Sequence, residues 1–374
     1  MSSARASRPL RVAFVINGLN RGGAETQLLR IAEEVKARGH EVALAVLNPE
    51  NDFAEQLAAL DVPVWAPEPG AGRWNRRHLR HLARELKAWQ PEVTVTFLFQ
   101  ATLYMRVVNL WVRPGRAIAS MRNDQLENRL RSVLYRVSCA ADDTIVVNSR
   151  AAAAKLQQLR TIPRSDKVTV IYNGIDAEQV RSRVRTPAEV TRRSLGVADD
   201  DVLLLGVGRL QPQKDWPTLL RALSLVGRSD VTCVIAGDGD LLEPLVELSR
   251  ELGVDQQVRF LGLRDDVPDL MAAADRLVMS SRYEGTPNVV LEALALDLPV
   301  TSTDVGACAE LLERPEDVIV PAEDAEALAA ALAQVSRRAP TSPLEAGEGA
   351  ARMAAFSWRH IGQSWTDLIT GQKA

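Results

Sequence analysis

Cysteine, histidine and aromatic residues are scarce in this chain of 374 residues. It contains three cysteines, four histidines and 5% aromatic residues. Cys139, Cys233 and Cys308 are far apart and odd in number, which argues against a disulfide framework and against a cysteine-rich metal site. We interpret them as small core residues of a protein in a reducing compartment.

Long apolar runs are also missing. The N-terminus has no apolar core ahead of a small-residue cleavage site, so the sequence predicts no export signal. The most apolar stretch, residues 93–112, contains Gln100, Arg106 and Asn109, which would be costly in lipid. We therefore expect a cytoplasmic chain, either soluble or held peripherally at the inner face of the plasma membrane.

The composition predicts two globular domains of different charge. The chain is 46% hydrophobic and 25% charged, which is too apolar for disorder, and it is too long for one ordinary core. Residues 1–170 contain 25 Lys and Arg against 16 Asp and Glu, whereas the net charge of the whole chain is -3. The basic half suits an anionic membrane or a phosphate-bearing acceptor. We expect no nucleic-acid partner.

Strand and helix patterns alternate twice along the chain. Residues 10–17 form a strand-length apolar run, which is followed by a glycine-rich turn, a helical pattern at 24–38 and a strand at 41–47. This βαβ pattern predicts a parallel sheet. Further strands are expected at residues 93–97, 116–120, 144–147 and 168–171. A second series is expected at 202–207, 231–236, 258–261, 276–280, 299–301 and 318–320.

These two series define the expected domain organisation. We assign residues 1–171 to an N-terminal Rossmann-like domain and residues 201–355 to a C-terminal one. Residues 172–200 form the expected inter-domain linker region. An alanine-rich helix is expected at 322–338, and the helical segment 356–374 is expected to pack back on the N-terminal domain. Trp358 and Trp365 in this segment have the spacing of core residues.

The segment EGTPNVVLE, residues 284–292, carries the clearest signal for a binding site. Pro287 suits the first turn of a helix. A phosphate oxygen is favoured at such a helix start, near the N–H groups of Thr286, Asn288, Val289 and Val290. Glu284 and Glu292 flank this point and can accept hydrogen bonds from sugar hydroxyls. The alternative, that Glu284 caps the helix and Glu292 is merely solvated, stays open.

Two further clusters lie at strand ends. In GVGRLQPQKD, Arg209 and Lys214 could neutralise a diphosphate, or the segment could be a surface loop in which Lys214 pairs with Asp215. Gly22 and Gly23 in the first turn would let the backbone approach a ligand. They do not belong to a GxGxxG fingerprint, which argues against an NAD enzyme.

Five segments in chain order carry a family resemblance. They are GGAE at 22–25, YNGID at 172–176, GRLQPQKD at 208–215, AGDGDL at 236–241 and EGTPNVVLEALALDLPVTSTDVG at 284–306. Together they resemble glycosyltransferase family 4. The resemblance implies the GT-B fold, an α/β architecture of two Rossmann-like domains facing across a cleft, with an N-terminal acceptor domain and a C-terminal donor domain. It also implies retention of anomeric configuration, no metal, and no cofactor beyond the nucleotide-diphosphate sugar.

The resemblance also implies roles for individual residues. Arg209 and Lys214 match the pair that holds the diphosphate, Glu284 matches the carboxylate at the donor sugar, and Glu292 matches the ribose ligand. Gly22 and Gly23 match the loop that faces the phosphates, and the backbone near Leu263 and Arg264 matches the base contact. No separate protein base is implied, because the acceptor proton passes to the donor phosphate.

One segment departs from the family pattern, and two acidic pairs look like metal-binding motifs. Where many members have a histidine, this chain has Arg122 and Asn123, which we assign to contact with the acceptor or the donor sugar, with a structural role as the alternative. Asp238 and Asp240 imitate a metal-binding DxD motif, and Asp265 and Asp266 form a second acidic pair. The surrounding resemblance identifies both pairs as turns.

The segment 73–89 reads as a basic amphipathic helix. Its apolar residues fall on one helical face, and arginines with Lys87 fall on another. Docking to an anionic membrane surface through Arg73 to Trp89 is one interpretation. An ordinary helix that covers the sheet and keeps its basic face in water is the other.

We conclude from the sequence that the chain moves a hexose from a nucleotide-sugar donor to a glycan or polyprenyl-diphosphate-linked acceptor in surface polysaccharide synthesis. Two alternatives remain. One is a nucleotide-sugar epimerase of the same architecture, and the other is a catalytically silent sugar-nucleotide binding protein of an assembly complex.

Overall fold

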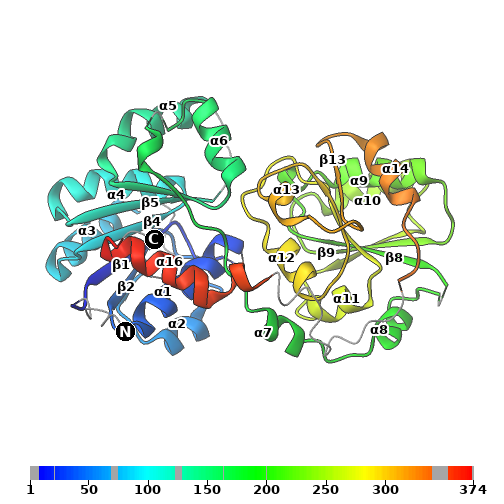
Figure 1. Ribbon diagram of the computed structural model, residues 1–374, viewed down its shortest axis with the longest axis horizontal. Coiled ribbons are helices and arrows are strands. Elements are labelled where there is room, and N and C mark those ends of the chain that lie inside the picture. The colour runs from blue at the N-terminus through cyan, green and yellow to red at the C-terminus, as the bar shows by residue number, and fades with distance from the viewer. Residues whose placement is uncertain are drawn as a thin grey trace. The chain divides into compact units, whose positions relative to one another are not determined.

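A computed structural model describes residues 8–20, 22–68, 75–122, 129–162, 164–198, 200–338 and 353–372 of the chain. The chain divides into two compact units (Figure 1). One comprises Met1–Gly174 with Trp358–Ala374, and the other comprises Ile175–Ser357. Each unit is an α/β domain built on a parallel sheet, as the alternating patterns predict.

The described residues of the first unit contain a seven-stranded parallel sheet in the order β3-β2-β1-β4-β5-β6-β7. Its strands are β1 Arg11–Ile16, β2 Glu41–Val46, β3 Val64–Trp65, β4 Val93–Phe97, β5 Arg116–Met121, β6 Thr144–Val147 and β7 Val168–Val170. All strands were expected except β3, which has two residues and is too short for a periodic signal.

Helices connect these strands and cover both faces of the sheet (Figure 1). They are α1 Gly23–Ala37, α2 Ala54–Leu60, α3 Arg76–Trp89, α4 Phe99–Val112, α5 Arg129–Ser138 and α6 Arg150–Gln158, with short 3-10 turns at η1 Cys139–Ala141 and η2 Ser165–Lys167. Side chains of β1 alternate between two clusters: Phe14 packs with α1, and Val15 packs with α3 and α4. A sheet buried on both faces needs the continuous apolar strands that the sequence shows.

The C-terminal helix α16, Trp358–Thr370, belongs to the first unit although the chain reaches it from the second. Trp365 is fully buried and stacks on Phe97 at a ring-centroid distance of 5.9 Å, and Trp358 is partly buried against the same core. The return of this helix is therefore confirmed. At the crossing, the Gln27 amide both donates to and accepts from the Gly174 backbone, at 2.8 Å each.

The described residues of the second unit contain a six-stranded parallel sheet in the order β10-β9-β8-β11-β12-β13. Its strands are β8 Val202–Val207, β9 Val231–Ala236, β10 Val258–Gly262, β11 Arg276–Met279, β12 Val300–Thr303 and β13 Val318–Val320. The helices are α7 Ala177–Ser182, α8 Ala188–Ser194, α9 Trp216–Val226, α10 Leu242–Glu251, α11 Val267–Ala273, α12 Asn288–Ala295, α13 Cys308–Leu311 and α14 Ala325–Ala333, with η3 Pro212–Lys214 and η4 Met353–Phe356.

The segment expected to be a linker, residues 172–200, is largely part of this second unit. Helix α7 packs on α12, and α8 packs on α11. The buried guanidinium of Arg192 donates to Asp275 Oδ2 at 3.1 Å and to the Ala273 carbonyl oxygen at 3.0 Å. Because Asp275 precedes β11, this ion pair fastens α8 to the sheet. The turn-rich start of the segment is where the chain passes from the first unit to the second. The polar residues that follow form tertiary contacts and are not a free linker.

Three other expectations can be compared with the structure. Helix α14 is shorter than the expected 322–338, and residues 339–352 lie outside the described residues. All three cysteines are buried and free. Among the described residues, no helix is both long and apolar enough to cross a membrane.

Candidate functional site

The loops that follow three neighbouring strands of the second unit form the candidate donor site, and two of these loops carry predicted residues. In the sheet, β8 lies next to β11, and β11 lies next to β12. Arg209 and Lys214 follow β8, Glu284 follows β11, and Gly306 follows β12. Because the strands are parallel, these loops lie at the carboxyl edge, where ligands of such sheets bind.

Lys214 and Glu284, which are 70 residues apart in sequence, form an ion pair. Lys214 Nζ donates to Glu284 Oε1 at 2.7 Å, and the two side chains are 17% and 10% exposed. Ser281 Oγ donates to the same oxygen at 2.8 Å. The alternative in which Lys214 pairs with Asp215 is wrong, because Asp215 accepts instead from Thr218 and pairs with Arg282. The structure thus places the residue predicted to bind the phosphate next to the residue predicted to bind the sugar.

Side-chain to backbone hydrogen bonds connect the loop that carries Lys214 with the loop that carries Glu284. Ser280 Oγ donates to the Lys214 carbonyl oxygen at 2.8 Å, and Gln213 Nε2 donates to the Tyr283 carbonyl oxygen at 2.9 Å. Thr303 Oγ1, at the end of β12, donates to the Ser281 carbonyl oxygen at 2.7 Å. The ion pair is therefore set in a frame that restricts both partners.

Gly306 brings the loop after β12 against the loop that carries Glu284. Its φ is +55°, and a Cβ built there would lie 2.1 Å from the Gly285 carbonyl oxygen. That oxygen accepts a hydrogen bond from the Ala307 N–H at 2.7 Å. Sequence reasoning assigned no role to Gly306 or Ser281, although Gly306 ends the quoted STDVG segment. A glycine just after a strand end was the available signal.

The helix after Glu284 begins at Asn288, one residue later than expected. Pro287 is the N-cap, with extended backbone angles, and is not the first helical residue. Thr286 is buried, whereas Asn288 and Val289 are partly exposed. The first-turn N–H groups remain the candidates for an anion, because a helix N-terminus carries partial positive charge.

Glu292 lies in the second turn of α12 and is partly exposed. Burial raises the pKa of this carboxyl to about 7, and the opposing charge of Arg183 lowers it only in part. Arg183 is the C-cap of α7, which contacts α12. Its guanidinium also donates to the Asp265 carbonyl oxygen at 3.3 Å. Sequence reasoning missed Arg183, and no local signal could have found it, because only the packing of α7 brings it here.

Arg209 is exposed at the end of β8, and its guanidinium forms no ion pair within the described part of the chain. Its backbone is fixed, because Trp216 Nε1 donates to the Arg209 carbonyl oxygen at 3.0 Å. The Trp216 ring in turn occupies the space where Gly206 lacks a side chain, since a Cβ there would lie 2.7 Å from the ring. Arg209 therefore has an anchored backbone and a cation available to a ligand.

Leu263 and Arg264 follow β10, which β9 separates from β8. Leu263 is 65% exposed. Arg264 forms a two-pronged ion pair with Asp266, at 2.7 and 2.5 Å. This pair is local and leaves the backbone near Leu263 as the predicted base contact.

The acidic segment AGDGDL forms a turn against the loop after β8. Gly237 and Gly239 have positive φ, and a Cβ on either would clash with the backbone of Gly208 or Leu210. Asp238 Oδ1 accepts from the Gly239 N–H at 2.8 Å. No cluster of three or more His, Cys, Asp or Glu residues suited to a metal ion occurs in the portions of the chain that the structure describes.

The remaining predicted residues belong to the first unit. Gly22 is the N-cap of α1, and Gly23 is its first residue. Arg122 is buried at the end of β5, where its guanidinium stacks on Phe97 at 4.4 Å and donates to Asn173 Oδ1 at 2.9 Å. No described residue accepts a hydrogen bond from its Nε or Nη2 atoms, and burial lowers its pKa to about 9. Asn123 lies outside the described residues.

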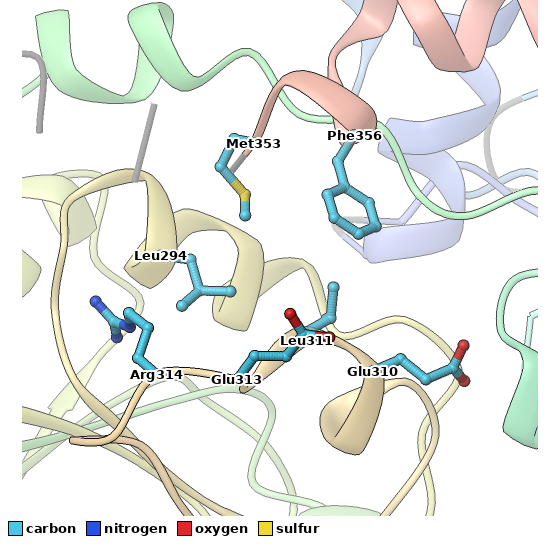
Figure 2. A pocket seen from close by; sticks show the side chains of 7 residues that line it. All are labelled: Leu294, Glu310, Leu311, Glu313, Arg314, Met353 and Phe356. Atoms are coloured by element: carbon cyan, nitrogen blue, oxygen red, sulfur yellow. The ribbon is translucent and has the colours of Figure 1, made fainter. Parts of the chain in front are cut away.

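A cavity of about 220 Å³ in the second unit does not coincide with these residues (Figure 2). It lies among the end of α12, α13 and η4, with Leu294, Leu311, Met353 and Phe356 on its apolar side. Glu310, Glu313 and Arg314 also line it. None of the predicted donor ligands lines this cavity, so we base the candidate site on the strand-end loops.

Two family models match successive parts of the chain. A model described as Glycosyltransferase Family 4 matches residues 21–179, and one described as Glycosyl transferases group 1 matches residues 201–338. A solved structure of Anabaena Alr3699/HepE in complex with UDP-glucose has a TM-score of 0.80 at 21% identity. The match covers 97% of this chain and 100% of that one, and it shows a shared fold.

Curated relatives match over shorter segments. A D-inositol 3-phosphate glycosyltransferase of Saccharomonospora viridis is 31% identical over 277 residues, which is 69% of this chain and 63% of the relative. An N-acetylgalactosaminyltransferase of Campylobacter jejuni, whose name gives a diphospho-undecaprenol-linked substrate, is 30% identical over 199 residues, or 53% of this chain and 50% of the relative. The chain thus spans less than two thirds of the length of these relatives. The two family models, the two Rossmann-like sheets and the glycosyltransferase relatives agree, and the chain belongs to glycosyltransferase family 4.

Proposed function

We propose that this chain transfers a hexose from a nucleotide-diphosphate sugar to a glycan or lipid-linked acceptor, with retention of anomeric configuration and without a metal ion. The observation that carries the proposal is the ion pair between Lys214 and Glu284 at the carboxyl edge of the second sheet. It joins a cation suited to a phosphate and a carboxylate suited to a sugar. A site of this kind can bind the sugar and the adjoining diphosphate of a nucleotide sugar.

Lys214 and Arg209 would stabilise the negative charge that develops during the reaction. When the bond between the sugar C1 and the donor phosphate breaks, negative charge grows on the departing diphosphate. Lys214 donates one of its three N–H groups to Glu284, so the other two can donate to a phosphate oxygen. Arg209 is exposed and forms no ion pair with the described residues. Preorganised cations of this kind stabilise a transition state, because they need no rearrangement during the reaction.

The carboxylates would orient the donor. Glu284 binds Lys214 and Ser281 through one oxygen, so its second oxygen can accept from a sugar hydroxyl. Glu292 would accept from the ribose diol. In the proposed step the acceptor oxygen forms the new bond to C1, its proton goes to the donor phosphate oxygen, and the nucleoside diphosphate leaves. No protein base is needed for this balance.

The acceptor and the cellular location form the less specific part of the proposal. The Campylobacter jejuni relative is named for a polyprenyl-diphosphate-linked substrate, and this supports a lipid-linked or glycan acceptor here. An acceptor of that class is held at a membrane. We therefore propose a cytoplasmic protein that works peripherally at the inner face of the plasma membrane in surface polysaccharide synthesis.

A donor panel tests the proposal. Purified protein is titrated by calorimetry with UDP-, GDP- and ADP-sugars, starting with UDP-glucose, and incubated with polyprenyl-diphosphate and glycan acceptors. We expect one nucleotide family to bind and to be turned over in the presence of chelator, with NMR showing a retained anomeric centre. Absence of binding and turnover across the panel overturns the proposal. An epimerised donor without acceptor would indicate the epimerase, and binding without turnover would indicate the silent binding protein.

A further inference from the structure

Large apolar side chains are exposed together on two helices of the first unit. Among the described residues, seven of the eleven exposed large hydrophobic side chains lie on α4 and α5. We call these seven the apolar ridge: Val107, Leu110 and Trp111 on α4, and Leu130, Val133, Leu134 and Val137 on α5. Leu110 and Val137 are 73% and 71% exposed. A concentration of this kind marks an interaction surface, whereas isolated exposed apolar residues do not.

Helical spacing makes the ridge continuous along each helix. The ridge residues of α4 recur at intervals of three and four, and those of α5 do the same over two turns. Helices α4 and α5 contact each other (Figure 1). The opposite faces hold buried residues, such as Met105 on α4 and Tyr135 on α5. Both helices therefore have a second apolar face that the core does not use.

Positive charge borders the ridge. Helix α5 carries Arg131 and Arg136, and neither the described side chains of α5 nor those of α4 include an acidic residue. The one arginine of α4, Arg106, is buried in an ion pair with Asp142. On the other side of α4 lies α3, where Arg80 and Arg84 are exposed.

Lys87 of α3 joins the basic flank to the ridge. Its Nζ lies 4.4 Å from the centre of the Trp111 ring, which is a cation–π distance. Tryptophan and lysine together are favoured at the boundary between lipid and water. The basic flank, defined as Arg80, Arg84 and Lys87, is therefore continuous with the apolar ridge.

The apolar face of α3 cannot itself enter a membrane. Leu82 and Leu86 are fully buried, and Leu79 and Ala83 pack against the same core cluster. This favours the interpretation of α3 as a helix that covers the sheet. The basic side of α3 remains exposed, so only its charge is available to a membrane, and another element must supply the apolar contact.

We propose that the apolar ridge of α4 and α5 seats this protein on an anionic lipid bilayer, with the basic flank of α3 against the headgroups. The ridge would lie at the depth of the acyl boundary, as in interfacial helices. The charge distribution selects this occupant over a second copy of the chain. A symmetric dimer through the ridge would bring two basic flanks together, whereas anionic lipid neutralises them.

Vesicle sedimentation tests the ridge. Full-length protein is spun with phosphatidylglycerol–phosphatidylcholine vesicles and with pure phosphatidylcholine vesicles, with no sugar donor or acceptor present. The ridge variant is Leu110→Ser/Val133→Ser/Val137→Ser. The control variant is Leu159→Ser/Leu225→Ser/Val190→Ser, which removes apolar side chains that are exposed elsewhere. We expect the ridge variant to lose at least about tenfold in vesicle affinity and the control to bind like the original chain.

Salt dependence tests the basic flank. Arg80→Gln/Arg84→Gln should weaken binding at low ionic strength, and its affinity should converge with that of the original chain at high ionic strength. Equal binding to neutral and anionic vesicles, or no binding at low salt, overturns the proposal. So does a dimer of the original chain that the ridge variant converts to monomer, because that result assigns the ridge to a second copy. Since the assay contains no sugar, its failure is separate from failure of the proposed transfer reaction.

Discussion

Lys214 Nζ lies 2.7 Å from Glu284 Oε1, although the two residues are 70 positions apart in the sequence. Neither charge is isolated, and neither is fully exposed. The pair therefore holds a cation and a carboxylate ready for a ligand that needs both.

Replacing Lys214 by methionine should remove sugar transfer while the fold persists. The change deletes a cation for the departing diphosphate and leaves the buried Glu284 with Ser281 as its one side-chain hydrogen-bond donor among the described residues. We expect kcat to fall by about 10²–10³, the range seen when one preorganised donor is removed. Steady-state kinetics measure this, with Arg221→Met on the exposed face of α9 as the control. A Lys214→Met enzyme with more than a third of the original kcat would contradict the role.

Glu292→Ala should weaken nucleotide binding specifically. The variant loses the carboxylate that we assign to the ribose diol, so calorimetry should give a dissociation constant raised by about tenfold or more. Glu251→Ala, at an exposed position of α10, should bind like the original chain. Unchanged affinity in Glu292→Ala would remove the ribose assignment.

Glu292→Gln should change the pH dependence of stability. The folded-state pKa is about 7, above the ordinary value of 4.5. Between these values the folded chain keeps the proton that the unfolded chain has lost, so the original chain loses stability as pH rises through this window. Glutamine has no such cost. Urea unfolding at pH 8 should find the variant more stable by on the order of 1 kcal/mol.

The same comparison below pH 4.5 is the internal control for Glu292→Gln. There the carboxyl is protonated in both the folded and the unfolded chain, so the stabilising effect should vanish. An equal difference at both pH values would mean that burial of the charged carboxylate is not its cause.

Gly306→Ala should destabilise the second unit and disturb the Glu284 loop. The new Cβ would lie 2.1 Å from the Gly285 carbonyl oxygen, and φ is +55°. Gly253→Ala is a matched control, because it has φ of +68° and no neighbour within 4 Å. We expect the control to cost about 1 kcal/mol from backbone strain, and Gly306→Ala to cost at least about 2 kcal/mol more. Equal urea midpoints for the two variants would contradict the clash.

Arg122→Met separates a ligand role from a structural role. The guanidinium is buried, its Nε and Nη2 atoms have no acceptor in the part of the chain that the structure describes, and burial lowers its pKa to about 9. Removing this desolvated charge should leave the free energy of unfolding unchanged or raise it by up to about 1 kcal/mol, with lost stacking on Phe97 as the opposing effect. Transfer activity should still fall at least about tenfold if Arg122 contacts a substrate. A lower melting temperature with normal activity per folded molecule would assign Arg122 to structure.

Sequence patterns predicted the elements of both sheets well. Branched apolar runs such as residues 202–207 and 231–236 became β8 and β9 with the expected bounds, because a strand buried on both faces needs apolar residues throughout. The two-residue β3 was missed. The extent of α14 and the start of α12 were also predicted incorrectly, because helix ends depend on caps and neighbours more than on periodicity.

The amino-acid sequence by itself determined the class of protein, the parallel sheets and the identity of the charged groups at the strand ends, because these follow from local pattern and from motifs in order. Only the tertiary structure decided which groups meet. It paired Lys214 with Glu284 and placed Arg183 near Glu292 through the packing of α7. It also buried the apolar face of α3 while leaving a second apolar face of α4 and α5 exposed. Such outcomes depend on contacts between distant segments, and the periodicity of one helix cannot tell which of its faces the core will cover.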